Sequence, residues 1–291
     1  MSLQVKFDTF CDHAAHGRLA DVQRMLDSGE LHCNGNENEA LWRAAQNGHV
    51  DVVDCLLRHA MFDPSANDND AIRWAAQYGH LAVVERLLQD ERVDPSANNN
   101  YALRWAVRNG HLAVVERLLQ DVRVDPSADK NIALREAAAI GHIAVVDRLL
   151  QDKRVDPSTR DNYAVRLAAA NGHLEVVDRL LQDRRVDPSA GDNYAVAWAA
   201  RRGHFAIVER LLEDVRVDVA VAIRQSRPEN RKRFECRERL TEICIALQDL
   251  ALPAWVTVQI LDAARPWSTL PLHSKWNLVC AIKHFRDKHP D

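Results

Sequence analysis

The sequence predicts an all-α solenoid, in which short helical units stack in a row and a C-terminal module of three helices closes the row. Seven glycines recur every 31 residues without an insertion, and histidine follows the last six of them. Apolar residues fall at helical spacing on both sides of each of these steps. A unit of this size cannot bury its own apolar face, so neighbouring units must stack. The seven glycines are Gly17, Gly48, Gly79, Gly110, Gly141, Gly172 and Gly203.

Each unit predicts two short helices that run in opposite directions. The phrase "ALRWAVRNGHLAVVERLL", Ala102–Leu119, largely repeats "AIRWAAQYGHLAVVERLL", Ala71–Leu88. Gly110 stands where the first helix must end, because glycine accepts the left-handed conformation without a Cβ clash. The predicted apolar face of the second helix consists of Leu112, Val115, Leu118 and Leu119. This face is expected to seal one unit to the next.

The connectors between the middle units share an Asp-Pro step, as in "RVDPSANNNY", where Asp94 precedes Pro95. Proline fixes φ and disfavours helix in the residue before it, and the Asn and Asp residues that follow tolerate turn geometry. The sequence therefore predicts that each connector is an extended turn or a hairpin finger.

This unit resembles the ankyrin repeat over about residues 5–218. The resemblance rests on Ala-Ala before the Gly-His step, Val-Val and Leu-Leu after it, and a projecting turn. The family unit usually has about 33 residues and a Thr-Pro-Leu-His signature, whereas this chain has 31 residues and "YALR" at Tyr101–Arg104. Its short, near-identical units resemble ankyrin arrays of large DNA viruses and protists.

The resemblance divides the chain into an ankyrin-repeat domain of seven repeats, residues 1–218, and a C-terminal helical module, residues 219–291. The charge changes at the same place, because the first part has a formal net charge of −8 and the second of +4.

The resemblance also implies that a partner protein binds the concave face formed by the connectors and the first helix of each unit. The columns on this face vary between units, whereas the columns that pack the helices do not. Tryptophan and arginine dominate the energies of protein interfaces. An alternative is that Trp74, Trp105 and Trp198 only cover apolar surface between units. The candidate partner-binding residues are Arg43, Trp74, Gln77, Tyr78, Tyr101, Trp105, Arg108, Asn109, Glu136, Tyr163, Trp198, Arg201 and Arg202.

Two further columns are predicted to be structural. A guanidinium in the arginine column can bridge carbonyl groups or an aspartate of the neighbouring finger. That column consists of Arg73, Arg104, Arg135 and Arg166. The Gly-His histidines supply one side chain per repeat, which spaces them too widely for metal–ligand bonds of about 2 Å. We therefore expect no metal site.

Composition and motifs exclude several classes of function. Phosphate-binding loops, nucleophile elbows and zinc motifs are absent, so we expect no catalytic residues and no cofactor. The formal net charge is −4, and the basic cluster Arg231–Arg233 is interspersed with glutamates, which argues against nucleic acid as a partner. The sequence has no membrane span or signal peptide, and its six cysteines form no CxxC pair. We expect a monomer with free thiols in the cytoplasm, with the nucleus left open.

The C-terminal module is predicted to contain helices at about Pro228–Leu247, from Pro253 onward, and at about Leu272–Lys288. One interpretation is a cap over the exposed apolar end of the solenoid. Two resemblances support another. "RLTEIC" followed by "LALP" resembles a SOCS box, and "LPAWVTVQIL" resembles the start of an F-box. Either implies a substrate receptor of a cullin-type ubiquitin ligase, with Leu240, Cys244, Leu252 and Pro253 as candidate adaptor-binding residues.

Overall fold

The computed structural model describes residues 3–29, 31, 38–214 and 216–225, and these residues form helices without any β-strand. The helices are α1 Leu3–Ala15, α2 Leu19–Asp27, α3 Glu39–Gln46, α4 Val50–Leu57, α5 Ala66–Tyr78, α6 Leu81–Leu88, α7 Ala97–Arg108, α8 Leu112–Leu119, α9 Ala128–Ile140, α10 Ile143–Leu150, α11 Thr159–Asn171, α12 Leu174–Leu181, α13 Ala190–Arg202, α14 Phe205–Leu211 and α15 Val219–Gln225.

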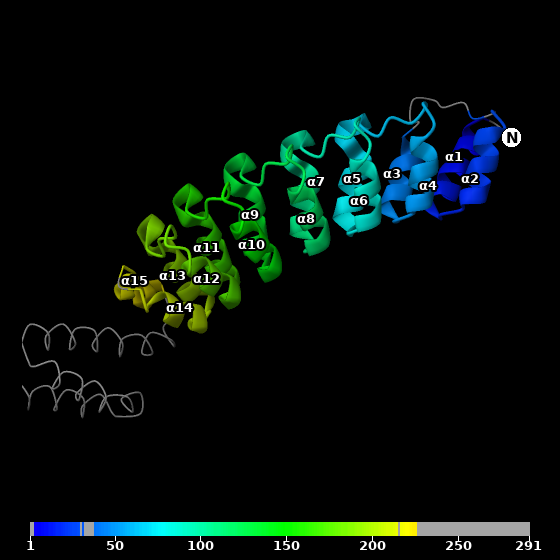
Figure 1. Ribbon diagram of the computed structural model, residues 1–291. Helices are drawn as coiled ribbons and strands as arrows, with labels where there is room; N and C mark the ends of the chain where they lie inside the picture. The colour runs from blue at the N-terminus through cyan, green and yellow to red at the C-terminus, as the bar shows by residue number, and fades with distance from the viewer. Residues whose placement is uncertain (1–2, 30, 32–37, 215, 226–291) are drawn as a thin grey trace, which may run out of the picture.

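Helices α1 to α14 form seven pairs that follow one another in chain order along a curved array (Figure 1). The first helix of each pair contacts the first helices of its neighbours, and the second helices contact one another in the same way. This two-layered arrangement confirms the predicted all-α solenoid. Helix α15 contacts α13. The three predicted C-terminal helices, with the adaptor-binding candidates Leu240, Cys244, Leu252 and Pro253, lie outside the described residues.

The glycine turn between the two helices of a pair is confirmed. Gly110 has φ of 73°, in the left-handed region. The backbone N–H of His111 donates to the carbonyl of Ala106 at 2.9 Å, which satisfies one of the free carbonyls at the end of α7. The chain then reverses into α8.

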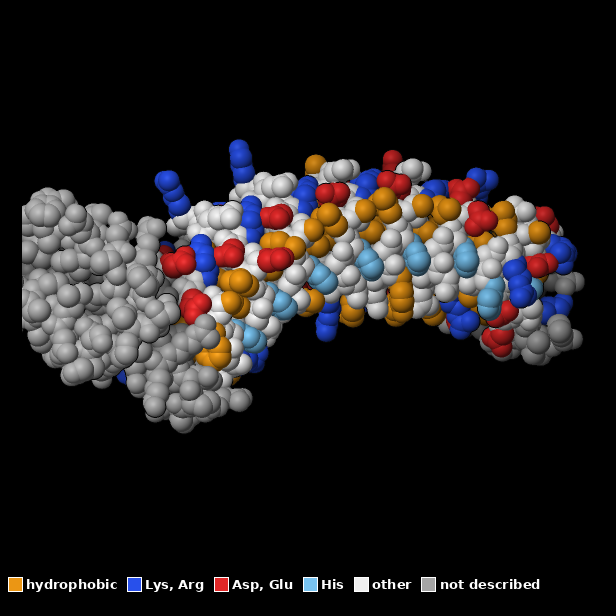
Figure 2. Space-filling view, turned by 90° about the horizontal axis from the view of Figure 1, so that it is seen from below, with side chains coloured by type: hydrophobic (Ala, Val, Ile, Leu, Met, Phe, Trp, Pro, Cys, Tyr) orange, Lys and Arg blue, Asp and Glu red, His pale blue; other side chains and the backbone are white. Residues whose placement is uncertain are grey.

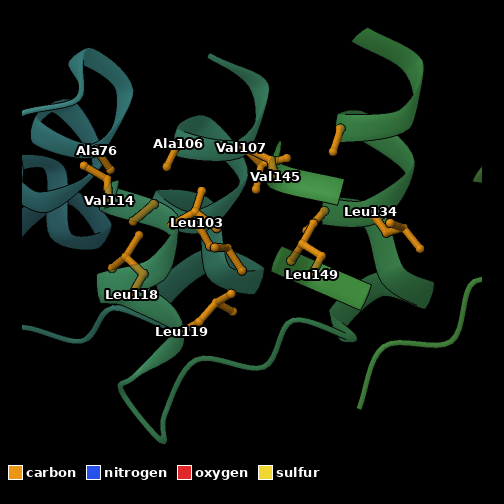
Figure 3. Close-up of a cluster of buried hydrophobic side chains, with 14 of the residues drawn as sticks. Ala76, Leu103, Ala106, Val107, Val114, Leu118, Leu119, Leu134, Val145 and Leu149 are labelled. Atoms are coloured by element: carbon orange, nitrogen blue, oxygen red, sulfur yellow. The ribbon is translucent and has the colours of Figure 1, made fainter. Parts of the chain in front are cut away.

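The core runs without a break along the array, and Figure 3 shows part of it between α5 and α10. In α8, Val115 and Leu118 are fully buried and Leu119 is 7% exposed, as the predicted face requires. Leu112 is only partly buried, and Val114 joins the core. The small side chains Ala106 and Val107 are fully buried in α7, which lets neighbouring first helices approach closely.

The connectors are turns rather than hairpins in the part of the chain that the structure describes. Before the right-handed part of α7 begins, Asn98, Asn99 and Asn100 adopt φ of 53°, 57° and 57°. Three consecutive left-handed residues are unusual, because each costs about 1–2 kcal/mol for an ordinary side chain and less for Asn, Asp or Gly. The same left-handed turn recurs at residues 67–69, 129–131, 160–162 and 191–193.

Candidate protein-binding face

The Gly-His edge is the side of the array on which the Gly-His steps lie. Contacts between neighbouring units hold this edge together. Its histidines form a row along one side of the molecule (Figure 2). Each Nε2 lies at hydrogen-bond distance from a carbonyl oxygen 34 residues earlier, which assigns the ring proton to Nε2. The pairs are His49 with Ala15 at 3.0 Å, His80 with Gln46 at 2.8 Å, His111 with Gln77 at 2.9 Å, His142 with Arg108 at 3.1 Å, His173 with Ala139 at 3.0 Å and His204 with Ala170 at 3.1 Å. These bonds confirm a structural role for the histidine column.

A histidine ring of the next unit also lies against the glycine in six of the seven units. A Cβ added to Gly110 would lie 2.8 Å from Cε1 of His142 in the next unit, closer than real Cβ contacts allow. Glycine is therefore required at this position for two reasons, its positive φ and its contact with the ring.

An asparagine column joins the left-handed turns to the next unit. Asn100 is 4% exposed, and its Oδ1 accepts from the backbone N–H of Asp125 at 3.1 Å. Its Nδ2 donates to the carbonyl of the same Asp125, also at 3.1 Å. The side-chain oxygen makes the equivalent bond in Asn38, Asn69, Asn131, Asn162 and Asn193. Asn69, Asn100, Asn131 and Asn162 are buried, so this part of each of their connectors lies inside the array.

The arginine column is also internal, as the sequence predicts. Arg73 donates to the carbonyl of Asn67 in its own turn at 3.0 Å, and its guanidinium carbon lies 4.6 Å from the ring centre of Tyr101 in the next unit. Arg135 donates to the carbonyl of Asp129 in the same way at 2.9 Å. A bond to a carbonyl is thus confirmed for Arg73, Arg135 and Arg166, although the turn belongs to the same unit. Arg104 instead donates to the carboxylate of Glu136 in the next unit.

Two of the predicted partner-binding tyrosines pack between arginines of this column. The ring of Tyr101 lies between the guanidinium groups of Arg73 and Arg104, at 4.6 and 5.6 Å. Tyr163 lies between Arg135 and Arg166, at 5.9 and 5.3 Å. Both rings are half-buried, so each has only part of its surface open to a partner.

A further arginine in the connectors after α6, α8, α10, α12 and α14 fixes an aspartate two residues before it. Arg123 donates from Nε and Nη2 to the two carboxylate oxygens of Asp121, at 2.9 and 2.7 Å, and from Nη1 to the carbonyl of Val93 in the preceding unit at 2.8 Å. These bonds from Arg123 are the main reason that the pKa of Asp121 lies below its ordinary value. The same lowering applies to the pKa values of Asp90, Asp152, Asp183 and Asp214.

The first-helix face is the surface formed by the first helix of each pair. It carries three separate aromatic groups. The first lies on α3 and α5, where the rings of Trp42 and Trp74 are 5.8 Å apart and those of Trp74 and Tyr78 are 6.1 Å apart. Tyr78 is 48% exposed, and its hydroxyl accepts from Nε2 of Gln46 at 3.3 Å. Gln77, the neighbour of Tyr78, is half-buried. This group presents a broad apolar surface with a polar tip.

The second group lies on α7. Trp105 meets the ring of Tyr101 edge-on at 5.8 Å, and the guanidinium carbon of Arg108 lies 5.5 Å from the centre of Trp105. Asn109 caps the helix by donating to the carbonyl of Trp105 at 2.9 Å. Both Arg108 and Asn109 are exposed, so this group ends in open polar side chains.

The third group lies on α13. The rings of Trp198 and Tyr194 are 5.6 Å apart, and the guanidinium carbons of Arg201 and Arg202 lie 5.1 and 5.2 Å from the centre of Trp198. Arg202 also donates to the carbonyl of Ala170 at 2.9 Å, which ties it to the preceding unit. Arg201 is the more available of the two arginines.

The remaining two candidates are held by ion pairs. Arg43 bonds to Glu39 one turn earlier at 2.6 Å. Glu136 accepts from Arg104 of the preceding unit at 3.1 Å. Both side chains are half-buried.

Sequence reasoning missed Trp42 as a member of the first aromatic group. The helices are offset along the stack, so that a side chain meets the residue 32 positions later rather than 31. Trp42 with Trp74, Gln46 with Tyr78 and Arg104 with Glu136 all follow this spacing. Reading pairs at 32 residues would have found Trp42. In the described residues, Trp74 makes no ring contact with Trp105, although both stand in one column.

The described residues contain no group of three or more His, Cys, Asp or Glu side chains that could hold a metal ion. None of their helices is long and apolar enough to cross a membrane. Cys11 is buried and Cys55 is half-buried, and the other four cysteines lie outside the described part.

Comparison with known proteins identifies the family. A family model described as ankyrin repeats in three copies matches residues 10–99, 74–161 and 134–223. These overlapping matches cover most of the chain, from Phe10 in α1 into α15. No curated protein matches the sequence. The helix pairs, the glycine turns and the family model agree, and the chain belongs to the ankyrin-repeat family.

Proposed function

We propose that this chain is a non-catalytic protein-binding scaffold, in which the seven helix pairs act as seven ankyrin repeats and the first-helix face binds a partner protein. Ankyrin repeats are protein–protein interaction modules. The observation that supports this face is the contrast between its columns and those of the Gly-His edge. Histidine occupies the edge in six units, whereas the face presents Trp74, Trp105, Glu136, Leu167 and Trp198 in turn.

Rigid presentation is the proposed mechanism. Hydrogen bonds between units hold both ends of α3, α5, α7, α9 and α11, through histidine at one end and asparagine at the other. Aromatic side chains on such helices lose little conformational entropy when a partner binds. We expect the chain to act as a monomer, with protein rather than nucleic acid as its partner.

Affinity capture from lysate tests the proposal. The full chain is compared with the Trp74→Ala/Trp105→Ala double variant and with Val122→Ala, whose side chain is 92% exposed on a connector. We expect the double variant to lose a specific protein that the wild type and Val122→Ala both retain. Identical captured proteins for all three chains would reject this face as the binding site.

The ubiquitin-ligase role is an alternative proposal, supported by the sequence resemblance of residues 239–261 alone. It predicts that the full chain captures a cullin adaptor complex, and that Cys244→Ala or Leu252→Ala weakens this capture while Trp74→Ala leaves it intact. Failure of the wild-type chain to capture any such complex would remove the alternative.

A further inference from the structure

A groove with a volume of about 570 Å³ lies between α13 and α15, beside the third aromatic group. Its walls include the left-handed turn at Gly191 and Asp192, the rings of Tyr194 and Trp198, and the carboxylate of Asp218. Ala197 lies on the wall as well. The lining residues therefore combine aromatic side chains with two carboxylates and two guanidinium groups, Asp192 and Asp218 with Arg201 and Arg224.

The preceding units show which side chain this position accepts. Ala197 stands in the arginine column, 31 residues after Arg166. The guanidinium carbon of Arg166 lies 5.3 Å from the ring centre of Tyr163 in its own unit and 4.1 Å from that of Tyr194 in the next. Arg166 also points Nη1 at the carbonyl of Asp161, at 3.4 Å. An arginine at 197 would face Tyr194 and the carbonyl of Asp192 by the same spacing.

The replacement of arginine by alanine leaves Tyr194 incompletely stacked. Tyr101 and Tyr163 each lie between two guanidinium groups, whereas Tyr194 has one, from Arg166, among the described residues. Tyr194 is 37% exposed, whereas the other two rings are half-buried. The groove thus lies where the second guanidinium of this tyrosine would be.

We propose that the groove binds the guanidinium group of an arginine side chain in an exposed peptide segment of a partner protein. The planar group stacks on the open face of Tyr194 and donates to the carbonyls of the turn and to Asp218. One carboxylate oxygen of Asp218 accepts from the backbone N–H of Ala220 at 2.8 Å. The other oxygen has no partner among the described residues. This inference rests on the proposed function in that it assumes a protein partner.

The selectivity for arginine follows from the shape and charges of the groove. Lysine has a compact ammonium group that cannot stack flat on a ring or donate in a planar fork. The groove also contains Arg201 and Arg224. Arg201 is directed onto Trp198, with its guanidinium carbon 5.1 Å from the ring centre. Asp192 and Asp218 balance these two positive charges.

The first test uses N-acetylarginine amide as the probe and follows the indole N–H signals of the full chain by NMR, with Trp198→Phe assigning the signal. We expect a saturable shift of the Trp198 signal that is at least about three times larger than that caused by N-acetyllysine amide at equal concentration. Absence of a shift, or equal shifts with the two probes, would overturn the proposal.

The second test fills the groove with a side chain of the protein itself. Ala197→Arg should abolish the response to the arginine probe, and should raise Tm by about 2 °C relative to Ala197→Met, which adds apolar volume without a guanidinium. An Ala197→Arg chain that still responds to the probe, or that melts no higher than Ala197→Met, would contradict the inference.

Two further outcomes separate this inference from other possibilities. A response that appears only after Arg231 and Arg233 are changed to Gln would assign the groove to the chain's own arginines and reject a partner as the source. A chain without any arginine response, whose captured protein still depends on Trp74 and Trp105, would reject the groove and leave the proposed function standing.

Discussion

The Gly-His edge and the first-helix face recur with the same period, yet they differ in what their side chains contact. At the edge, the side chain of every histidine is directed to a carbonyl of the preceding unit, and histidine occupies six of the seven positions. On the face, the column two residues before the glycine changes between units, and its members Arg108 and Arg201 are exposed. That column reads Gln77, Arg108, Ala139, Ala170 and Arg201. Repetition in this chain therefore identifies residues that join units, and we expect the exposed residues of the varying columns to be available to a partner.

This comparison predicts that substitutions at the edge reduce stability and that substitutions on the face reduce binding. The largest effect is expected at Gly110. Alanine there must adopt a φ of 73° and would lie 2.8 Å from the ring of His142. The left-handed conformation costs about 1–2 kcal/mol, and displacement of the ring removes a hydrogen bond worth about 1 kcal/mol more. We expect Gly110→Ala to lose about 3 kcal/mol of unfolding free energy in urea titration.

Gly203→Ala is the matched control for this prediction. Its φ is 82°, but an added Cβ meets no described atom within 4 Å. This variant should lose about 1–2 kcal/mol of unfolding free energy, which is the cost of the left-handed conformation alone. Equal losses at Gly110 and Gly203 would show that the histidine contact has no energetic role.

The next effect is expected at Asn100, which combines a left-handed φ with two hydrogen bonds to Asp125. We expect Asn100→Ala to reduce the unfolding free energy by about 2–3 kcal/mol. Asn100→Gly keeps the backbone conformation and loses only the hydrogen bonds, so its loss should be smaller. Urea titration of the three chains checks the order, and a glycine variant less stable than the alanine variant would contradict it.

A smaller effect concerns acid stability. Because Arg123 holds the pKa of Asp121 below its ordinary value of about 3.9, the pair stabilises the fold above that pH. This contribution is lost as the pH falls through the lower folded pKa. At pH 7, Asp121→Asn should lose about 1 kcal/mol, and its Tm should fall less between pH 5 and pH 3 than that of the wild type. Glu116→Gln, at an exposed position, serves as the control, and parallel acid profiles for all three chains would refute the prediction.

The smallest effect on stability is expected on the face. Arg108 is exposed and contacts Trp105 at the open end of α7. We expect Arg108→Ala to change the unfolding free energy by less than about 0.5 kcal/mol while it weakens capture of the partner. A large loss of stability with unchanged capture would contradict the prediction that substitutions on the face reduce binding rather than stability.

The fold could be predicted from the sequence because the period indicates how the units stack and the helical spacing indicates which face of each helix is buried. Gly110 and Leu118 behave as predicted, since both depend on contacts that every unit repeats. The left-handed turns were not predicted. The Asn residues in "SANNNY" tolerate several turn types, and the bond between Asn100 and the next unit favours this one.

The candidate site was harder to predict for a geometric reason. Columns read at 31 residues give positions on a face but not the neighbours of each side chain. The offset between helices directs Trp74 to Trp42, and it encloses Tyr101 and Tyr163 between arginines. Exposure therefore distinguishes Tyr78 and Arg108 from these two tyrosines, and the sequence pattern does not contain that information.

Hydroxyl-radical footprinting of the full chain, with and without a captured partner, tests the central claim most directly. The method reports the solvent access of individual aromatic and methionine side chains. We predict that the partner reduces oxidation of Trp74, Tyr78 and Trp105, and leaves Met61, which is 40% exposed on the connector after α4, unchanged. Protection of Met61 with unchanged oxidation of the three aromatic side chains would contradict the account.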